Sequence, residues 1–231
     1  MVMSLTEDFL SLVFPNNCAA CGNNLFEHEE VICSLCEFHL PQTNYHMDYD
    51  NPVAALFWGR AQVKSAAAYY HFNKGNRVQH LVHLLKYKGR CDVGIYLGRQ
   101  YGQYLKNSPL FRSVQMIIPV PLHRSKLLKR GYNQSEQFAL GLSRSMNLPL
   151  NITSLTRTQA SQTQTRKSRF NRWENVSGIF EVSDSESLID KHILLVDDVI
   201  TTGSTLEACI TVLQTIPGIR ISVAAIAVAM I

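Results

Sequence analysis

The segment from Ile193 to Thr205 combines residue types that together can hold a sugar phosphate. Four apolar residues are followed by two acids and then by hydroxyl residues around one glycine. Carboxylates at the end of a buried strand can accept hydrogen bonds from neighbouring sugar hydroxyls, and a hydroxyl-rich helix N-terminus binds a phosphate dianion. The alternative is an acidic turn in which Ser204 caps a helix. In a sugar-phosphate site, the sugar-binding acids would be Asp197 and Asp198, and the phosphate-binding residues would be Thr201, Thr202, Gly203, Ser204 and Thr205.

Four of the six cysteines form two Cys-x-x-Cys pairs with eleven residues between them. Two thiolates at this spacing grip one metal ion, and two such pairs complete a tetrahedral site. We expect a structural zinc ion with no open position for a catalytic water, although redox-active or unpaired core cysteines are alternatives. Disulfides are disfavoured, because no secretory signal is recognised and cytosolic thiols stay reduced. The four metal ligands are Cys18, Cys21, Cys33 and Cys36.

Composition predicts a folded protein that does not enter a membrane. Of 231 residues, 46% are hydrophobic and 17% are charged, with a formal net charge of +4. This mild basicity suits phosphate-bearing ligands but does not by itself indicate nucleic acid. No apolar run reaches the roughly 18 residues that span a bilayer. Residues 1–14 fit a packed amphipathic helix, because Leu5, Phe9, Leu12 and Val13 share one helical face. We therefore expect a cytoplasmic protein.

Strand-like and helix-like segments alternate beyond residue 60, which predicts a mostly parallel sheet flanked by helices. Residues 1–45 then form a helix and a cysteine module, residues 46–60 a linker, and residues 61–231 the α/β domain. Asp92 is expected to cap one helix, and Cys209 to pack inside another as a small apolar residue. The predicted strands are 63–72, 114–120, 193–196 and 219–229, and the predicted helices are 76–87, 92–106, 133–146 and 206–216.

These pieces, in this order, resemble the ComF family of competence proteins. The segment 193–205 resembles the phosphoribosyl-diphosphate (PRPP) motif of type I phosphoribosyltransferases. The resemblance covers nearly the whole chain. It is carried by the two cysteine pairs, Leu-Lys-Tyr-Lys-Gly at 85–89, Ile-Pro-Val-Pro-Leu at 118–122, Arg-Gly-Tyr-Asn-Gln at 130–134, a run from Gln164 through Arg172 and Asn175 to Phe180, and the motif itself.

The resemblance implies a type I phosphoribosyltransferase fold with an N-terminal zinc module. Asp197 and Asp198 would contact the ribose hydroxyls, and residues 201–205 would hold the 5-phosphate. A turn after one strand would bind the diphosphate together with Mg²⁺, and residues 124–131 would form a mobile lid. That turn comprises Pro119, Val120, Pro121, Leu122 and His123.

The positions of several basic residues agree with a diphosphate-binding site at this turn, because cationic groups and a metal ion stabilise a departing diphosphate. Lys86 either reaches the diphosphate or complements a helix dipole. Residues 121–131 and 157–172 are rich in Arg and Lys and contain no acid. Each run is alternatively a solvated loop or a contact to a nucleic-acid backbone, with Phe170 and Trp173 available to stack on bases. The basic residues are Arg124, Lys126, Lys129 and Arg130 in the first run, and Arg157, Arg166, Lys167, Arg169 and Arg172 in the second.

Two functions remain open at this point. In the first, the protein transfers phosphoribosyl from PRPP to an unidentified acceptor. In the second, it is an accessory of DNA uptake whose pocket senses PRPP or a nucleotide. Its partners would then be single-stranded DNA and a competence helicase, and the zinc module would dock the helicase. The sequence does not identify the acceptor.

Overall fold

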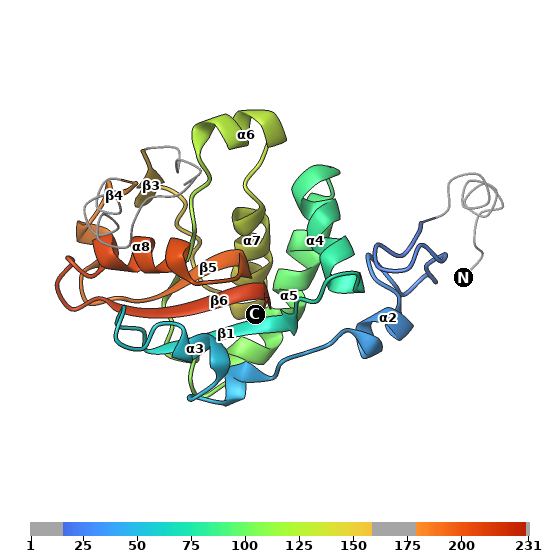
Figure 1. The fold of residues 1–231 in the computed structure, drawn as a ribbon, viewed down its shortest axis with the longest axis horizontal. Helices are drawn as coiled ribbons and strands as arrows, with labels where there is room; N and C mark the ends of the chain where they lie inside the picture. Colours follow the sequence, from blue (N-terminus) through green and yellow to red (C-terminus); the bar gives the residue numbers. More distant parts are fainter. Residues whose placement is uncertain (1–15, 159–178, 230–231) are drawn as a thin grey trace.

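A four-stranded parallel sheet forms the centre of the computed structural model, which describes residues 16–158 and 179–229 (Figure 1). The strand order is β1-β6-β5-β2, so β5 and β6 occupy the middle. All three neighbouring pairs are parallel, and the pairing of Leu194 with Ile117 and Ser222 is representative of the register. The strands are β1 (Ser65–His71), β2 (Met116–Pro119), β5 (His192–Ile200) and β6 (Arg220–Val228). The predicted parallel sheet is confirmed.

Helices cover both faces of this sheet, which explains why the central strands are apolar on both sides. On one face, Leu194 packs in a cluster with Leu81, Leu97 and Phe138 from three helices. On the other face, Leu195 packs with residues of two further helices. The first group is α4 (Arg77–Tyr87), α5 (Cys91–Asn107) and α7 (Gln134–Met146), and the second is α3 (Pro52–Ala55) and α8 (Ser204–Leu213).

Glycines allow α5 and α7 to pack backbone against backbone. A Cβ atom added at Gly98 would lie 2.1 Å from the carbonyl oxygen of Phe138, and one added at Gly141 would lie 2.1 Å from that of Ile95. Neither position therefore tolerates a side chain without moving a helix. This close contact positions the first turn of α7, which carries Ser135 next to Asp197.

Several boundaries differ from those predicted. Asp92 does not cap α5: Arg90 is the N-cap residue, and Asp92 lies in the first turn, where its carboxylate pairs with Arg90 at 2.7 Å. The strand expected to end at Val196 continues through both acids to Ile200, because its pairing with β6 extends that far. Cys209 is fully buried in α8, as predicted.

The N-terminal part of the described chain packs onto the same core. Ile32 and Cys36 belong to the apolar cluster that contains α5, and the Tyr96 hydroxyl donates to Glu37 at 3.1 Å. Residues 46–60, predicted as a linker, contribute the buried side chains of Val53 and Phe57 to the opposite cluster. The division of the chain at residues 45 and 60 stays a prediction.

The remaining elements are short. They are α2 (Ser34–His39), α6 (Arg124–Arg130), a hairpin of β3 (Leu155–Arg157) and β4 (Phe180–Val182), and the 3-10 turns η1 (Tyr45–Met47) and η3 (Glu186–Leu188). Within the described ranges, none of the helices is both long and apolar enough to cross a bilayer. The predicted helix at 1–14, and most of the basic run at 157–172 together with Gln164, Arg172 and Asn175, lie outside the described residues.

Candidate functional site

The two acids lie near the carboxyl end of β5, at the centre of the sheet edge where α4, α7 and α8 meet. The Asp198 side chain is almost completely buried, with 4% of its residue surface exposed. One carboxylate oxygen, Oδ1, lies 2.9 Å from Nζ of Lys86 at the end of α4. The other, Oδ2, is buried and has no hydrogen-bond partner among the residues that the structure describes. A buried unpaired acceptor is costly unless a ligand satisfies it.

Asp197 is only partly buried and lines a small hollow beside the loop that follows β5. Its Oδ1 accepts hydrogen bonds from the Ser135 hydroxyl at 2.9 Å and from the Asp198 amide at 2.8 Å. Burial and the neighbouring charge of Asp198 raise the pKa of the Asp197 carboxyl, against the opposing effect of these donors. The two acids thus have different surroundings: one is held by an ion pair, and the other by neutral donors.

Residues 201–205 form the turn into α8 and line the same hollow. Gly203 precedes the helix with φ of +75°, a left-handed conformation that glycine adopts without strain. The side chains of Thr201, Thr202, Ser204 and Thr205 are exposed, and the hydroxyls of Thr202 and Ser204 lie 2.9 Å apart. The first N–H groups of a helix have no partner within it. The Ser204 amide donates a long hydrogen bond to the Thr202 hydroxyl at 3.5 Å. Hydroxyls and helix N-terminal amides therefore gather where the motif predicts a phosphate.

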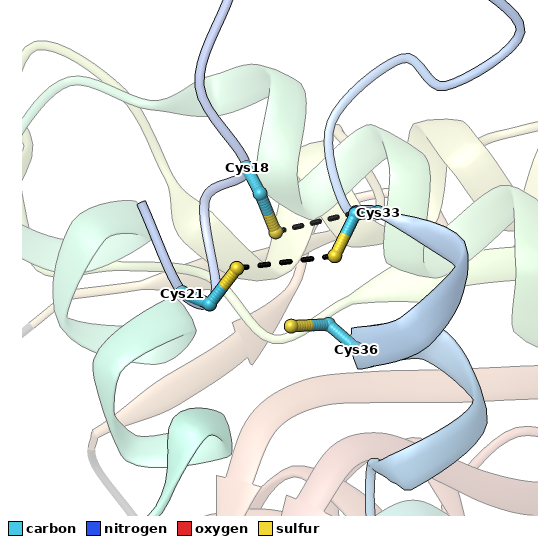
Figure 2. A group of neighbouring side chains, drawn as sticks. All are labelled: Cys18, Cys21, Cys33 and Cys36. Atoms are coloured by element: carbon cyan, nitrogen blue, oxygen red, sulfur yellow. Dashed lines mark hydrogen bonds between the residues drawn. The ribbon is translucent and has the colours of Figure 1, made fainter. Parts of the chain in front are cut away.

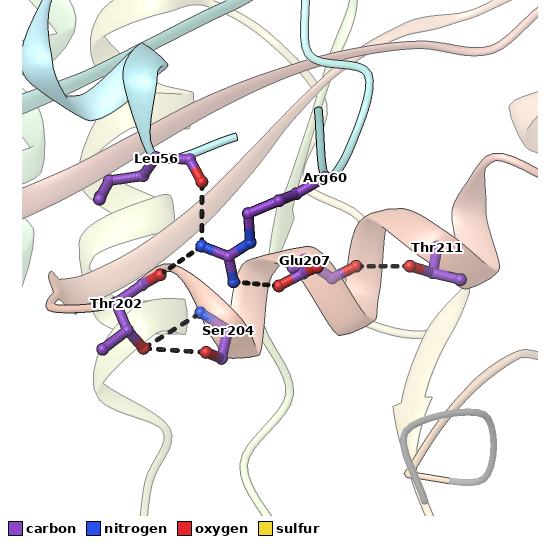
Figure 3. A network of polar contacts seen from close by, with 6 residues as sticks. All are labelled: Leu56, Arg60, Thr202, Ser204, Glu207 and Thr211. Atoms are coloured by element: carbon purple, nitrogen blue, oxygen red, sulfur yellow. Dashed lines mark hydrogen bonds and ion pairs between the residues drawn. The ribbon is translucent and has the colours of Figure 1, made fainter. Parts of the chain in front are cut away.

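Arg60 links this loop to Leu56 and Glu207, as Figure 3 shows. Its guanidinium donates to the carbonyl oxygens of Leu56 at 3.0 Å and Thr202 at 3.1 Å, and it forms an ion pair with Glu207 in the first turn of α8. Sequence patterns did not indicate this residue. No local signal could have found it, because Arg60 and Thr202 are 142 residues apart in the chain.

The turn after β2 lies beside the strand that carries the acids. The amide of Val120 donates to the Val196 carbonyl at 2.8 Å, and the Asn133 side chain donates to the Val120 carbonyl at 3.0 Å. Pro119 ends β2 on the edge of the sheet, where a missing N–H is tolerated. The predicted turn, Pro119, Val120, Pro121, Leu122 and His123, therefore lies at the same sheet edge as Asp197.

Within the described residues, the basic residues of α6 form no ion pair with Asp197 or Asp198. The helix has no buried residue and rises above the sheet in Figure 1, with His123 as its N-cap. Arg130 at its end lies over the Tyr87 ring, 5.5 Å from the ring centroid, and donates to Gln134. Arg124 and Lys126 are exposed and make no ion pair with the acids in the described parts of the chain. Among the predicted basic residues of this region, Lys86 contacts an acid directly, whereas Arg130 contacts the neighbouring Tyr87.

One described residue of the second basic run also lies near the acids. Arg157, at the end of β3, lies 5.1 Å from the Phe180 ring centroid. Burial, which outweighs the neighbouring charge of Asp197, lowers the pKa of this guanidinium. The β3–β4 hairpin therefore brings a cation toward the α8 side of the site.

The four predicted cysteine ligands converge on one point in the N-terminal module (Figure 2). Their sulfur atoms all lie within 4.8 Å of one another, and those of Cys21 and Cys33 are 3.8 Å apart. A tetrahedral site with zinc–sulfur bonds of about 2.3 Å has edges of about 3.8 Å, so the donor set fits a metal ion. Burial acts to raise the pKa of the Cys18 thiol, but backbone N–H donors, that of Cys33 foremost, bring it down to about 7.

Comparison with known proteins agrees with this geometry. The phosphoribosyl transferase domain family matches residues 133–229. Competence protein F of Haemophilus influenzae is 34% identical over 204 residues, which cover 84% of this chain and 89% of that protein. DNA utilization protein YhgH of Escherichia coli O157:H7 is 32% identical over 128 residues, 54% of this chain; this chain spans only 56% of that relative.

Among solved structures, a purine phosphoribosyltransferase from Pyrococcus horikoshii is similar over 62% of this chain and 76% of its own, with a TM-score of 0.37 and 21% identity. The match to Competence protein F extends along most of both chains. The predicted resemblance is confirmed: the chain belongs to the ComF family and carries a phosphoribosyl transferase domain.

Proposed function

We propose that the site at the end of β5 binds PRPP and that the protein transfers its phosphoribosyl group to an acceptor. The observation that carries this proposal is the buried, unpartnered Oδ2 of Asp198 next to the hydroxyl-rich turn. A ribose hydroxyl would satisfy this oxygen, and a second hydroxyl would bind Asp197. The 5-phosphate would then lie at the N-terminus of α8, among the side chains of residues 201–205.

The cations around the acids fit the other end of the same ligand. Lys86 contacts Asp198, and Arg130 lies over the ring of the adjacent Tyr87. Both would supply positive charge to a diphosphate attached to the ribose. Mg²⁺, when bound with the diphosphate, would neutralise its charge while keeping several of its own waters. The turn from Pro119 to His123 would contact the diphosphate through its backbone.

The role of the two acids in the transfer reaction follows from their negative charge. Loss of diphosphate leaves positive charge on the anomeric carbon, and the two carboxylates near the ribose favour that charge. Lys86 keeps one oxygen of Asp198 engaged, so that the other faces the sugar. Arg60 stabilises the phosphate-binding turn by donating a hydrogen bond to the Thr202 carbonyl.

A screen for diphosphate release tests this function. The purified protein is mixed with PRPP, Mg²⁺ and, in separate reactions, nucleobases, nucleotides and single-stranded DNA. Acceptor-dependent release, lost in an Asp197→Asn/Asp198→Asn variant, supports a transferase. PRPP binding without release in any reaction would instead favour a ligand sensor that assists DNA uptake.

A role as an accessory of DNA uptake has partial support, because the relatives are a competence protein and a DNA utilization protein. In this reading the protein is an accessory of DNA uptake, and its zinc module docks a helicase that works on single-stranded DNA. The cysteine module exposes Phe26, Leu35 and Phe38, which suits contact with another protein. A transformation assay with the double Asp variant decides whether the pocket matters: normal transformation would show that it does not.

A further inference from the structure

A second and larger cavity lies at the opposite edge of the sheet, where β1 and β6 begin. Its volume is about 760 Å³. The residues that line it are Tyr49, Ala54, 58–59, 61–65, Gln214, Ile216 and 218–221. Cavities that bind small molecules usually measure roughly 300–1,000 Å³. Because all four strands are parallel, this edge lies at the start of β5, whereas Asp197 lies in the second half of that strand. The proposed PRPP site does not use it.

The cavity offers flat apolar surface. Two aromatic residues line it while remaining largely open to solvent: Trp58 is 60% exposed and Tyr49 is 58% exposed. A second ring that stacks on such a side chain removes apolar surface of both rings from water. The other apolar residues that line the cavity are Ala54, Ala61, Val63, Ile216, Ile219 and Ile221.

Both charged side chains that line the cavity are basic, and the carboxylate of Asp190 lies against Gly218, one of the lining residues. Lys64 and Arg220 line it, and none of the residues that line it is acidic. Lys64 donates to the Ser113 hydroxyl at 2.9 Å, and Arg220 forms no ion pair within residues 16–158 and 179–229. Behind them, His192 is fully buried between the hydroxyls of Ser113 and Ser222. Burial, followed by the charges of Lys64 and Arg220, lowers its pKa to about 4, so the histidine adds no charge at neutral pH.

We propose that this cavity is a nucleotide site, in which the base stacks on Trp58 or Tyr49 and the phosphate binds Lys64 and Arg220. A flat ring joined to an anion is the chemistry that two exposed aromatic residues and two cations recognise together. The nucleotide is either free or one unit of a single strand, since both present the same base and phosphate. The site is independent of the PRPP motif.

Isothermal titration calorimetry on the full chain tests the proposal with two probes, AMP and a twelve-residue oligothymidylate. Trp58→Leu and the double variant Lys64→Gln/Arg220→Gln are each expected to weaken binding at least about tenfold. These side chains are exposed, so unchanged melting temperatures will show that the variants fold. Binding of AMP identifies a free nucleotide, and binding of the oligomer alone identifies a strand; both support the site.

AMP also carries a phosphate that could enter the turn before α8, so a matched control is required. Thr202→Ala/Ser204→Ala removes hydroxyls from that turn and is expected to leave binding in the cavity unchanged. If this control loses binding while the cavity variants keep it, the nucleotide occupies the PRPP site and the proposal is wrong. Absence of binding by both probes at millimolar concentration would also overturn it. If PRPP fails to bind, the proposed PRPP site is wrong, but the proposed nucleotide site in the cavity is unaffected.

Discussion

Lys86 on α4 and Asp198 on β5 form an ion pair, with 2.9 Å between Nζ and Oδ1. The contact joins the end of the helix to the end of the strand, and it neutralises an almost completely buried carboxylate. Because only Oδ1 is engaged, Oδ2 remains for a ligand. The positive charge of Lys86 and the unpaired oxygen of Asp198 therefore belong to the same site.

Replacing Lys86 by Met should destabilise the protein by roughly 1–3 kcal/mol, because the buried carboxylate then loses its partner. Urea unfolding at pH 7 measures this change. Lys88→Met is the matched control, since Lys88 is exposed and lies two residues further along the chain; it should change the free energy of unfolding by less than about 0.5 kcal/mol. Equal stability of the two variants would show that the ion pair contributes little.

The cysteine cluster should bind one zinc ion per chain, measured by elemental analysis of the purified protein. Cys33→Ser removes one ligand and should lower both the zinc content and the melting temperature, because a structural metal contributes folding free energy directly. Cys91→Ser is the control, since Cys91 lies outside the cluster. Unchanged melting of the wild-type protein after confirmed metal removal would contradict a structural role.

Gly98→Ala should destabilise the protein by roughly 1–3 kcal/mol, because the added methyl group meets the Phe138 carbonyl and pushes α5 away from α7. Gly94→Ala is the matched control, because Gly94 lies in the same helix as Gly98. There the nearest atoms to the new Cβ are Cβ of Gln137 and Cδ1 of Leu85, both at 3.0 Å, so the clash is weaker than that with the Phe138 carbonyl at 2.1 Å. Thermal unfolding compares the two, and an equal loss in both would refute the close helix contact.

His192 should make stability depend on pH below neutrality. Burial lowers its pKa to about 4 in the folded protein from an ordinary 6.5, so the unfolded chain binds the proton more readily. Stability from this residue is present above pH 6.5 and is lost as the pH falls toward 4. The loss between pH 7 and pH 4.5 should be roughly 2–3 kcal/mol.

His192→Asn keeps a polar side chain but cannot titrate, and it provides the comparison for this pH effect. Its free energy of unfolding is expected to be lower than that of the wild type at pH 7 and to fall less steeply toward pH 4.5. Release of metal from the cysteines affects both proteins equally. Parallel slopes for the two proteins would show that His192 is protonated equally in the folded and unfolded states.

The elements and the motifs of this chain could be predicted because their signals are local. Apolar runs indicate the four strands, and the spacing of Cys18, Cys21, Cys33 and Cys36 predicts the cluster that the structure forms. The predicted end of β5 is too early because acids are poor strand residues. Pairing with β6 outweighs that local preference and carries the strand to Ile200.

The contacts between distant residues could not be predicted in the same way. Arg60 reaches Thr202 because the segment after α3 packs against the turn before α8, where Phe57 lies next to Gly203. Lys86 reaches Asp198 because α4 ends at the same sheet edge. The sequence predicts a diphosphate or the helix dipole as the partner of Lys86, whereas the contact that Lys86 makes in the structure is with the acid. Such partners depend on how elements pack in three dimensions, which no periodicity in the sequence encodes.

Titration of PRPP in the presence of Mg²⁺ by calorimetry tests the central proposal most directly. The wild-type chain and an Asp184→Asn control, altered at an exposed acid, should bind alike. Asp197→Asn/Asp198→Asn should bind roughly 100-fold more weakly, because each lost hydrogen bond to a carboxylate contributes roughly 1.5 kcal/mol. Equal affinity in all three proteins would contradict the proposed site.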